Sequence, residues 1–265
     1  MSQSVISTTI QRMEHGSFRE TQDVVAIEEP LEISVDGRSI SITMRTPAND
    51  EELALGFLFS EGILRDRSQV AEVSQIDDNR VNIALAGSAG VDLARLDRHF
   101  YTSSSCGVCG KTSIQALEMA GCPLIPRDRP MVAYALVCGM PEKLRSRQMV
   151  FDRTGGLHGA GLFDASGNLI DLREDVGRHN AVDKLFGAAF RQGKLPLNDY
   201  VLMLSGRASF ELVQKAVMAG IGVIVAVGAP SSLAIELAEQ FAVTLIGFAR
   251  GERFNVYSGA FRLNP

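Results

Sequence analysis

Three apolar runs late in the chain constrain the fold most. They are Tyr200-Val-Leu-Met-Leu204, Val223-Ile-Val-Ala-Val227 and Val243-Thr-Leu-Ile-Gly-Phe248. Helical patterns follow the first two runs, over residues 209–219 and 231–241. Uniformly apolar strands that alternate with helices are typical of a largely parallel sheet covered on both faces. We therefore expect an α/β domain in the second half of the chain.

Further elements of this domain precede the apolar runs. Residues 141–152 and 180–191 have helical patterns, and strand patterns at 159–163 and 168–172 flank a turn. Together these elements predict a domain over residues 126–265. Its fold class is α/β, with helices on both faces of the sheet and hence three layers.

The first half has a different pattern, which indicates a small α+β part. Asp36-Gly37 is a strong hairpin signal between two strand patterns. The expected order is strands, a helix and strands, at 31–35, 39–44, 51–62, 70–76 and 80–85. This order predicts a small roll of β-grasp type.

The domain limits follow from composition. Residues 1–20 are polar and aperiodic, which predicts a flexible N-terminal arm. The proline-rich stretch 121–130 marks the boundary between a first domain at 21–125 and the second at 126–265.

Charge and targeting signals narrow the function classes. A net charge of −5 and a pI near 5.5 disfavour bulk binding to nucleic acid. The N-terminus lacks the cationic and apolar regions of a secretory signal, and no stretch suits a membrane span. We expect a cytoplasmic protein, in which four cysteines serve as thiols rather than structural disulfides.

The segment Tyr101-Thr-Ser-Ser-Ser-Cys-Gly-Val-Cys-Gly-Lys111 carries the most reactive pattern. Serine hydroxyls, backbone N–H groups and the Lys111 ammonium would lower the pKa of Cys106 or Cys109. Four interpretations stay open: a zinc site, a thioredoxin-like dithiol, an inert pair, and a persulfide carrier. A zinc site normally needs a second close pair, and a thioredoxin-like pair lies where a strand meets a helix. We expect no metal site.

Two histidine-bearing stretches allow a ligand-binding interpretation. Thr154-Gly-Gly-Leu-His158 invites comparison with zinc deaminases, but Ala160 stands where their catalytic glutamate would be. The stretch 174–184 contains no cysteine, so their metal ligands are absent. His158 is then a packing residue or a hydrogen-bonding one. In the second stretch, His179 is either part of a capped helix start or a donor to an anionic or purine-bearing ligand.

The ends of the apolar strands offer a phosphate site. Leu204 is followed directly by Ser-Gly-Arg207 and a helix, at the edge of the sheet where α/β proteins bind ligands. Arg207 and free backbone N–H groups suit a phosphate. After the last run, Arg250 and Arg253 could clamp a diphosphate while Phe248 stacks on a ring, or they are a solvated pair on a turn.

Five ordered motifs together resemble the formate dehydrogenase accessory sulfurtransferase family, from about residue 20 to the C-terminus. They are Ser-Ser-Cys106-Gly-Val-Cys109-Gly, Thr154-Gly-Gly-Leu-His158, the stretch from Glu174 to Lys184, Ser205-Gly-Arg207 and Gly247-Phe-Ala-Arg250. The resemblance implies a cytidine-deaminase-like second domain that lacks the zinc site. Carried over by position, Cys106 bears a persulfide and Cys109 is its companion. The segment that looks like the family's cofactor-binding part comprises Phe248, Ala249, Arg250, Gly251, Glu252 and Arg253.

The function that the resemblance implies is sulfur transfer. Such a protein takes sulfane sulfur from a cysteine desulfurase and passes it to the molybdenum bis(molybdopterin guanine dinucleotide) cofactor of formate dehydrogenase. It would work as a homodimer, and guanine nucleotide alone is a candidate ligand. The alternative is a non-catalytic chaperone that binds the pterin nucleotide and hands it on.

Overall fold

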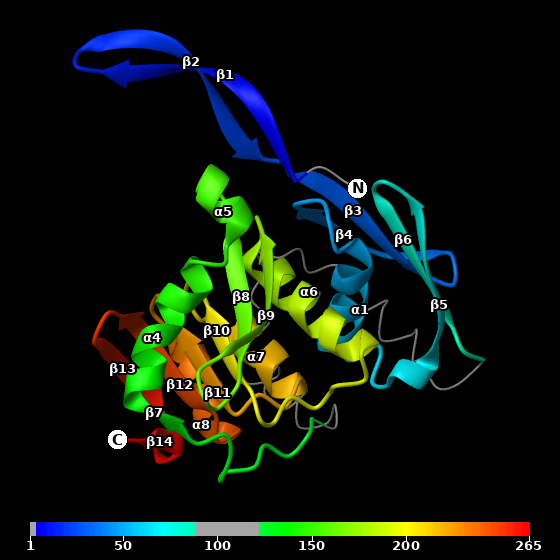
Figure 1. The fold of residues 1–265 in the computed structure, drawn as a ribbon. Coiled ribbons are helices and arrows are strands. Elements are labelled where there is room, and N and C mark those ends of the chain that lie inside the picture. Colours follow the sequence, from blue (N-terminus) through cyan, green and yellow to red (C-terminus); the bar gives the residue numbers. More distant parts are fainter. Residues whose placement is uncertain (1–3, 88–121) are drawn as a thin grey trace.

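The computed structural model describes residues 4–87 and 122–265, and its largest unit is a six-stranded sheet (Figure 1). Its strands are β8 (His158–Phe163), β9 (Leu169–Asp175), β10 (Val201–Leu204), β11 (Val223–Ala226), β12 (Thr244–Arg250) and β13 (Arg253–Ser258). They are arranged in the order β13-β12-β11-β10-β8-β9. Only β10–β11 and β11–β12 pair in parallel, and the other three pairings are antiparallel. The expectation of a largely parallel sheet is therefore wrong, because short turns join β8 to β9 and β12 to β13, and short turns give antiparallel pairs.

Helices cover both faces of this sheet, as expected for three layers. One face packs against α6 (Arg178–Arg191), α7 (Phe210–Met218) and α8 (Ser232–Gln240), and the other against α4 (Tyr134–Arg145). Side chains alternate between the two sides along β10: Leu202 and Leu204 join the first cluster, and Val201 and Met203 join the second. All four are buried, which explains why the strand is uniformly apolar.

The helix expected at 141–152 is displaced. Two helices occupy the region, α4 and the short α5 (Met149–Thr154). Val137, Met140 and Leu144 are buried on one face of α4, at the spacing of an amphipathic helix. Because that apolar face begins before Pro141, the helix includes the proline rather than starting at it.

The first half contains a four-stranded sheet with the order β4-β3-β6-β5. Its elements are β3 (Glu29–Val35), β4 (Arg38–Arg45), β5 (Val70–Asp77), β6 (Arg80–Leu85) and the helix α1 (Asp50–Ser60). These bounds confirm the expected strands and helix. Leu31, Ile33 and Val35 alternate inward from β3 and are buried in the main core. The likeness to β-grasp and cytidine-deaminase folds stays a prediction.

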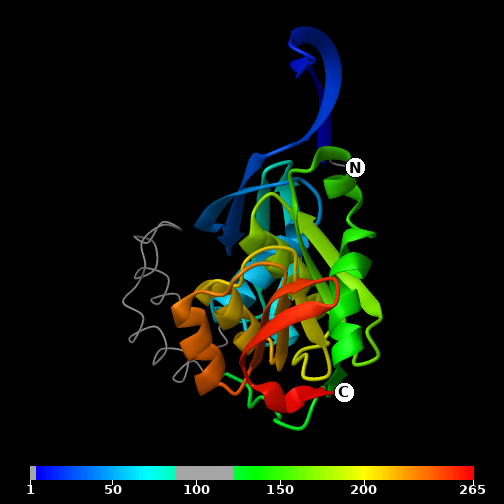
Figure 2. The same ribbon diagram turned by 90° about the vertical axis from the view of Figure 1, so that its left-hand side faces the viewer.

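The N-terminal residues form a long hairpin. Strands β1 (Val5–Glu14) and β2 (Ser17–Ala26) pair in antiparallel register and extend away from the body (Figures 1 and 2). The sequence predicted a flexible arm at residues 1–20 and no strands there; the strands are a new finding, and the flexibility stays a prediction. Most of these side chains are exposed on both faces, so no apolar alternation marked the strands in the sequence.

Four short elements complete the described part of the chain. They are η1 (Arg67–Gln69), η2 (Ala260–Arg262), and the strand pair β7 (Val132–Ala133) and β14 (Leu263–Asn264).

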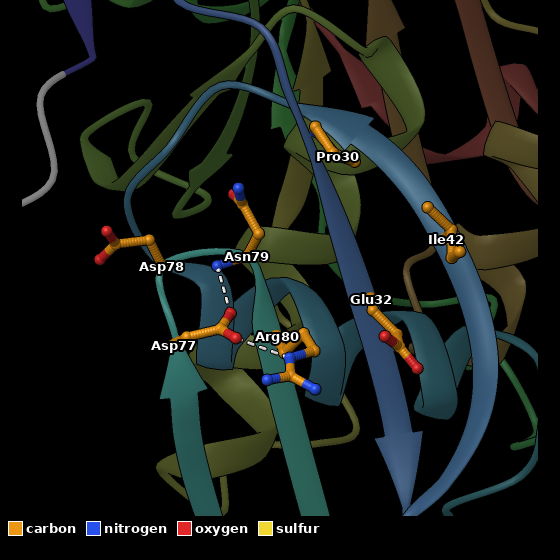
Figure 3. A pocket seen from close by; sticks show the side chains of 7 residues that line it. All are labelled: Pro30, Glu32, Ile42, Asp77, Asp78, Asn79 and Arg80. Carbon is orange, nitrogen blue, oxygen red and sulfur yellow. Dashed lines mark hydrogen bonds and ion pairs between the residues drawn. The ribbon is translucent and has the colours of Figure 1, made fainter.

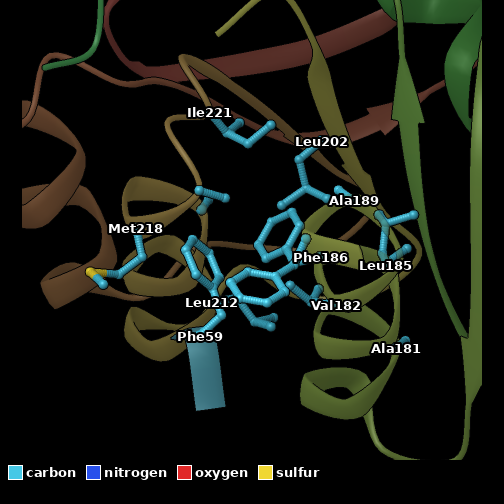
Figure 4. Packing of buried hydrophobic residues seen from close by; sticks show 14 of the residues in the cluster. Phe59, Ala181, Val182, Leu185, Phe186, Ala189, Leu202, Leu212, Met218 and Ile221 are labelled. Carbon is cyan, nitrogen blue, oxygen red and sulfur yellow. The ribbon is translucent and has the colours of Figure 1, made fainter. Parts of the chain in front are cut away.

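One hydrophobic core runs through both halves. Figure 4 shows Phe59 of α1 among side chains of α6 and α7, and the Phe59 and Phe190 ring centroids lie 5.8 Å apart. Helices α1 and α6 meet at two glycines: a Cβ on Gly56 would lie 1.8 Å from the Asp183 carbonyl oxygen, and one on Gly187 would lie 1.8 Å from that of Glu52. The division at residue 125 stays a prediction, but packing across it is extensive.

Buried polar groups also join the halves. Lys184 Nζ lies 2.7 Å from Asp175 Oδ2 and donates to the Thr46 carbonyl oxygen at 2.8 Å. Lys215 Nζ donates to both oxygens of Asp183 at 2.9 Å, and Ser60 Oγ of the first half donates to the same carboxylate at 2.8 Å. Burial alone would lower the pKa of Lys215, but the Asp183 and Glu61 carboxylates together outweigh it and raise this pKa. These buried charges are therefore paired, as buried charges must be to avoid a large desolvation penalty.

Candidate functional site

The two cysteines expected to carry the chemistry, Cys106 and Cys109, lie outside the described residues, so their assignment stays a prediction. The other two cysteines, Cys122 and Cys138, are half-buried. Cys122 contacts the buried Met218 at 3.3 Å between the sulfurs, and burial raises its pKa. A raised pKa disfavours the reactive thiolate, which agrees with a packing role for Cys122.

The loops at the carboxyl ends of β10, β11 and β12 are joined by backbone hydrogen bonds along one edge of the sheet. The Gly228 N–H donates to the Gly206 carbonyl at 2.9 Å, and the Phe248 N–H donates to the Gly228 carbonyl at 3.1 Å. These bonds align the three loops that follow the strands. Because β10, β11 and β12 are parallel, Ser205-Gly-Arg207 lies beside the loop at Gly228, and that loop lies beside Phe248.

Strand β8 adds a histidine to the same edge, because it runs antiparallel to β10 and begins where β10 ends. The Gly159 N–H donates to Ser205 Oγ at 2.8 Å, and the Ser205 N–H donates to the Gly159 carbonyl. His158 lies against Gly206, where a Cβ would approach its Nδ1 to 3.4 Å. Burial, and then the Arg178 charge, lower the pKa of His158, which favours the neutral ring.

The first turn of α6 places His179 beside the start of α7. His179 Nε2 lies 3.4 Å from Ser209 Oγ and 3.8 Å from Glu211 Oε2. Burial, with the positive charges of Lys215 and Arg178, lowers the pKa of His179 to about 4. At neutral pH the ring is uncharged, and one nitrogen accepts a hydrogen bond while the other donates one. Such a ring can recognise a purine edge.

The segment after β12 forms the turn of the β12–β13 hairpin. Arg250 and Arg253 pair directly across this hairpin, with Gly251 at φ +57° in the turn and Glu252 exposed beside it. Like charges in directly opposed positions are unfavourable unless an anion lies between them. The register therefore supports the expected anion clamp.

Within the segment 248–253, Phe248 and Ala249 differ in exposure and therefore in how they could contact a ligand. Phe248 is exposed with φ +54°, an uncommon conformation for a bulky residue, and a register shift follows it in β12. Strain of this kind persists where the surrounding structure enforces it, and it often marks a ligand site. The Ala249 side chain is buried in the second core cluster, so only its backbone could contact a ligand.

Four arginines at this edge have no carboxylate partner. Within residues 4–87 and 122–265, no ion pair involves Arg178, Arg207, Arg250 or Arg253. The buried Nε of Arg178 has no hydrogen-bond partner in this part of the chain. An unpaired buried donor costs free energy that an anionic ligand would recover. In the same part of the chain no group of three or more His, Cys, Asp or Glu side chains could hold a metal ion.

Some residues of the stretch 174–184 bind the first half of the chain and others face the sheet edge, and the sequence alone did not distinguish these two groups. Asp175, Asn180 and Lys184 bind the first half of the chain: the Asn180 amide donates to the Met44 carbonyl at 2.7 Å. Arg178 and His179 instead face the sheet edge. Sequence reasoning missed Ser209 and Glu211, whose contacts with His179 depend on how α6 and α7 pack.

Comparisons with known proteins agree with this architecture. A solved structure, that of a putative formate dehydrogenase accessory protein from Desulfotalea psychrophila, aligns with a TM-score of 0.79 and 26% identity, covering 99% of this chain and 100% of that one. The fold is thus of the class found in that accessory protein. The sequence profile described as the FdhD/NarQ family matches residues 26–264. The chain belongs to the FdhD/NarQ family, which confirms the resemblance found from the motifs.

Two similar proteins carry the name sulfur carrier protein FdhD. The one from Streptomyces coelicolor is 48% identical over 262 residues, covering 95% of this chain and 93% of that protein. The one from Sulfolobus acidocaldarius is 42% identical over 255 residues, covering 96% and 97%. In the described ranges of this chain, every helix is too short or too polar to cross a membrane.

Proposed function

We propose that this protein is a sulfurtransferase that carries sulfane sulfur as a persulfide on Cys106, from a cysteine desulfurase to the molybdenum bis(molybdopterin guanine dinucleotide) cofactor that formate dehydrogenase needs. The observation that carries the proposal is the family match, because it spans residues 26–264 and thus includes Cys106-Gly-Val-Cys109. The relatives named as sulfur carriers support the transfer of sulfur, and the solved accessory protein supports formate dehydrogenase as the destination.

Loading is a thiolate exchange. The Cys106 thiolate attacks the terminal sulfur of the desulfurase persulfide, and the bond between the two desulfurase sulfurs breaks. The desulfurase thiolate leaves, and Cys106 holds the new persulfide. No oxidant or reductant is consumed. The polar, glycine-rich sequence around Cys106 suits a low thiol pKa and access for a partner protein.

Delivery as a sulfide takes two electrons, and Cys109 supplies them. Its thiolate attacks the inner sulfur of the Cys106 persulfide, a Cys106–Cys109 disulfide forms, and HS⁻ leaves to become a ligand of the molybdenum. A cellular dithiol reductant then restores both thiols. The reducing cytoplasm supplies such dithiols, so we place the protein there.

The sheet edge holds the cargo in this proposal. The guanine dinucleotide tails carry diphosphates, which suit Arg178, Arg207 and the opposed pair Arg250 and Arg253. The exposed ring of Phe248 can stack on a guanine. Hydrogen bonds from neutral His179 would add recognition of the base, and guanine nucleotide alone would bind at the same edge.

Mass spectrometry of the loaded protein tests the assignment. After incubation with a cysteine desulfurase and cysteine, we expect the wild-type protein to gain one sulfur atom on Cys106. Cys106→Ala should remain unmodified, whereas Cys109→Ala should load normally but fail to release sulfide. Cys138→Ala, in helix α4, is the matched control and should behave as the wild type. A desulfurase-treated protein that carries no additional sulfur would refute the proposal.

The alternative function is a cofactor chaperone without sulfur chemistry. The arginine-rich edge favours it as much as it favours a carrier, because binding the cargo needs no thiol. Complementation of a strain that lacks the protein separates the two. A chaperone predicts full formate dehydrogenase activity with Cys106→Ala, and a carrier predicts none.

A further inference from the structure

The serines that precede α7 and α8 occupy equivalent positions but use their hydroxyls differently. Ser231 caps α8, because its side chain accepts a hydrogen bond from the Ala234 N–H at 3.3 Å. Ser209 occupies the same N-cap position of α7, but its side chain makes no capping bond. It lies instead 3.4 Å from His179 Nε2. Since serine is preferred at this position for its capping bond, the different use of Ser209 needs another explanation.

The single hydrogen of the Ser209 hydroxyl is used by Glu211. The Ser209 side chain is hydrogen-bonded to the Glu211 carboxylate. Burial would raise the pKa of Glu211, but hydrogen bonds from its own N–H and from Ser209 lower it, so this side chain is ionised at neutral pH. An ionised carboxylate only accepts hydrogen bonds, and Ser209 is therefore the donor. Only the lone pairs of Ser209 Oγ remain for His179.

The direction of these bonds fixes which nitrogen of His179 carries the proton. Because Ser209 Oγ can only accept, Nε2 must donate to it, and Glu211 Oε2 at 3.8 Å favours a proton on the same nitrogen. The ring is neutral at pH 7, since burial and the positive charges of Lys215 and Arg178 lower its pKa to about 4. A neutral imidazole carries one N–H, so Nδ1 keeps its lone pair.

The Nδ1 atom of His179 is free to meet a ligand. It has no hydrogen-bond partner in residues 4–87 and 122–265, and it is not among the buried unpaired atoms of that part of the chain. Its charged neighbours at the edge are arginines, which only donate hydrogen bonds. Nδ1 is thus an acceptor placed among donors, and a ligand group that carries an N–H can use it.

We infer that Ser209 and Glu211 are positioning residues that hold His179 in one tautomer, with the proton on Nε2 and Nδ1 free to accept from a ligand. The ligand that fits is a phosphorylated heterocycle with an N–H on its edge: the arginines bind the phosphates, and Nδ1 binds the N–H. Guanine and a pterin both have such an edge, with a ring N–H beside an amino group. For its ligand, though not for the tautomer, this inference rests on the proposed function.

The hollow on the outer face of the four-stranded sheet does not suit such a ligand. Figure 3 shows that it is lined by the carboxylates of Glu32, Asp77 and Asp78, and that Arg80 is paired with Asp77 at 2.6 Å. Carboxylates repel phosphates, so a phosphorylated ligand should avoid this hollow. The edge beside His179 is the better place for it.

Nuclear magnetic resonance of protein labelled with ¹⁵N-histidine tests the tautomer. The chain has four histidines, and the signals of His179 are those that vanish in His179→Gln. We expect only the tautomer with the proton on Nε2 in the wild type. In Glu211→Ala the Ser209 hydroxyl is free to donate to Nε2, so the tautomer with the proton on Nδ1 should appear in a comparable amount. Glu236→Ala, which changes an exposed glutamate of α8, is the matched control and should leave the tautomer unchanged.

Three ligands test the role of Nδ1 in the same spectra. Guanosine diphosphate and neopterin, a pterin without a nucleotide, show which ring lies at His179, because that ring shifts the Nδ1 resonance. Purine riboside diphosphate has the phosphates but no N–H on its base, and should not shift it. If guanine is the ring, the wild type should bind guanosine diphosphate about tenfold more tightly than purine riboside diphosphate, and Glu211→Ala should lose most of this preference. A merely structural role of Glu211 would change both affinities by the same factor.

Three results would overturn the inference: a wild-type His179 with the proton on Nδ1 or on either nitrogen, an unchanged tautomer in Glu211→Ala, or an Nδ1 resonance that neither guanosine diphosphate nor neopterin shifts. None of these readouts involves Cys106 or sulfur. A protein that takes up sulfur but shows both tautomers would refute only the inference, and one with a fixed tautomer that takes up no sulfur would refute only the proposed function.

Discussion

The junction of the two halves and the edge of the six-stranded sheet share helix α6, but they differ in whether their charged side chains are paired. At the junction each buried lysine lies within 3 Å of an aspartate: Lys184 pairs with Asp175, and Lys215 with Asp183. At the edge, four arginines have no such partner within residues 4–87 and 122–265. Satisfied charge fixes the fold, whereas unsatisfied charge is available to a ligand.

The largest effect should come from the backbone contact at the junction. In Gly187→Ala the new Cβ would meet the Glu52 carbonyl oxygen at 1.8 Å, so α1 and α6 must separate. We expect the free energy of unfolding to fall by about 5 kcal/mol, or the variant to fail to fold. Gly139→Ala, inside α4 with no atom within 4 Å of the new Cβ, is the control and should be neutral or stabilising. Urea unfolding measures both, and equal stability of the two variants would contradict the close contact.

Removing one partner of a buried ion pair should lower the free energy of unfolding by somewhat less than Gly187→Ala does. Lys184→Met leaves Asp175 buried without its countercharge, which we expect to destabilise the protein by about 3 kcal/mol. Lys194→Met changes an exposed lysine and should be within about 0.5 kcal/mol of the wild type. Thermal unfolding followed by circular dichroism compares them. Similar losses in both variants would show that Lys184 is not a junction residue.

The edge should show the reverse behaviour, with little effect on stability and a large one on binding. Arg207→Gln removes the charge-assisted contact that we propose with a diphosphate, and we expect guanosine diphosphate to bind about tenfold to a hundredfold more weakly. Arg147→Gln replaces an exposed arginine elsewhere and should leave affinity unchanged. Isothermal titration calorimetry provides both values. Unchanged affinity in Arg207→Gln would remove this arginine from the site.

The smallest effect concerns pH. His179 has a pKa of about 4 in the folded protein against 6.5 as its ordinary value, so the unfolded chain binds more protons between those limits. Stability present above pH 6.5 is therefore lost as the pH falls towards 4. His179→Gln should lose less stability than the wild type between about pH 7 and about pH 5. Identical pH profiles in urea unfolding would place His179 in a solvated setting.

Local apolar patterns explain which parts of the fold could be predicted. The sequence indicated β10 and β11 because each is a buried, uniformly apolar run that a helix follows, and it indicated β12 because that strand begins with four buried residues after a helix. The pattern failed where most side chains of an element are exposed, as in the β1–β2 hairpin and in the edge strand β13. It also misplaced α4, because Pro141 suggested a helix start that burial of Val137 overrides.

The candidate site was predictable to the same extent. The position of Arg207 followed from the rule that strand ends gather at one edge of a sheet. The different roles of the residues within 174–184 could not be predicted, because they depend on which side chains of α6 contact the distant residues Thr46 and Met44. Nor could spacing reveal that Arg250 and Arg253 oppose each other, because the register of the hairpin sets that pairing.

The glycine contact between α1 and α6 has a mechanical consequence. Where two backbones touch, no side chain lies between them that could change rotamer and act as a hinge. The halves of the molecule should consequently move as one rigid block, with the arginine-rich edge held at a constant distance from the four-stranded sheet. In the proposed function, a cofactor bound at that edge would therefore keep a fixed position, and the sulfur would have to move to it.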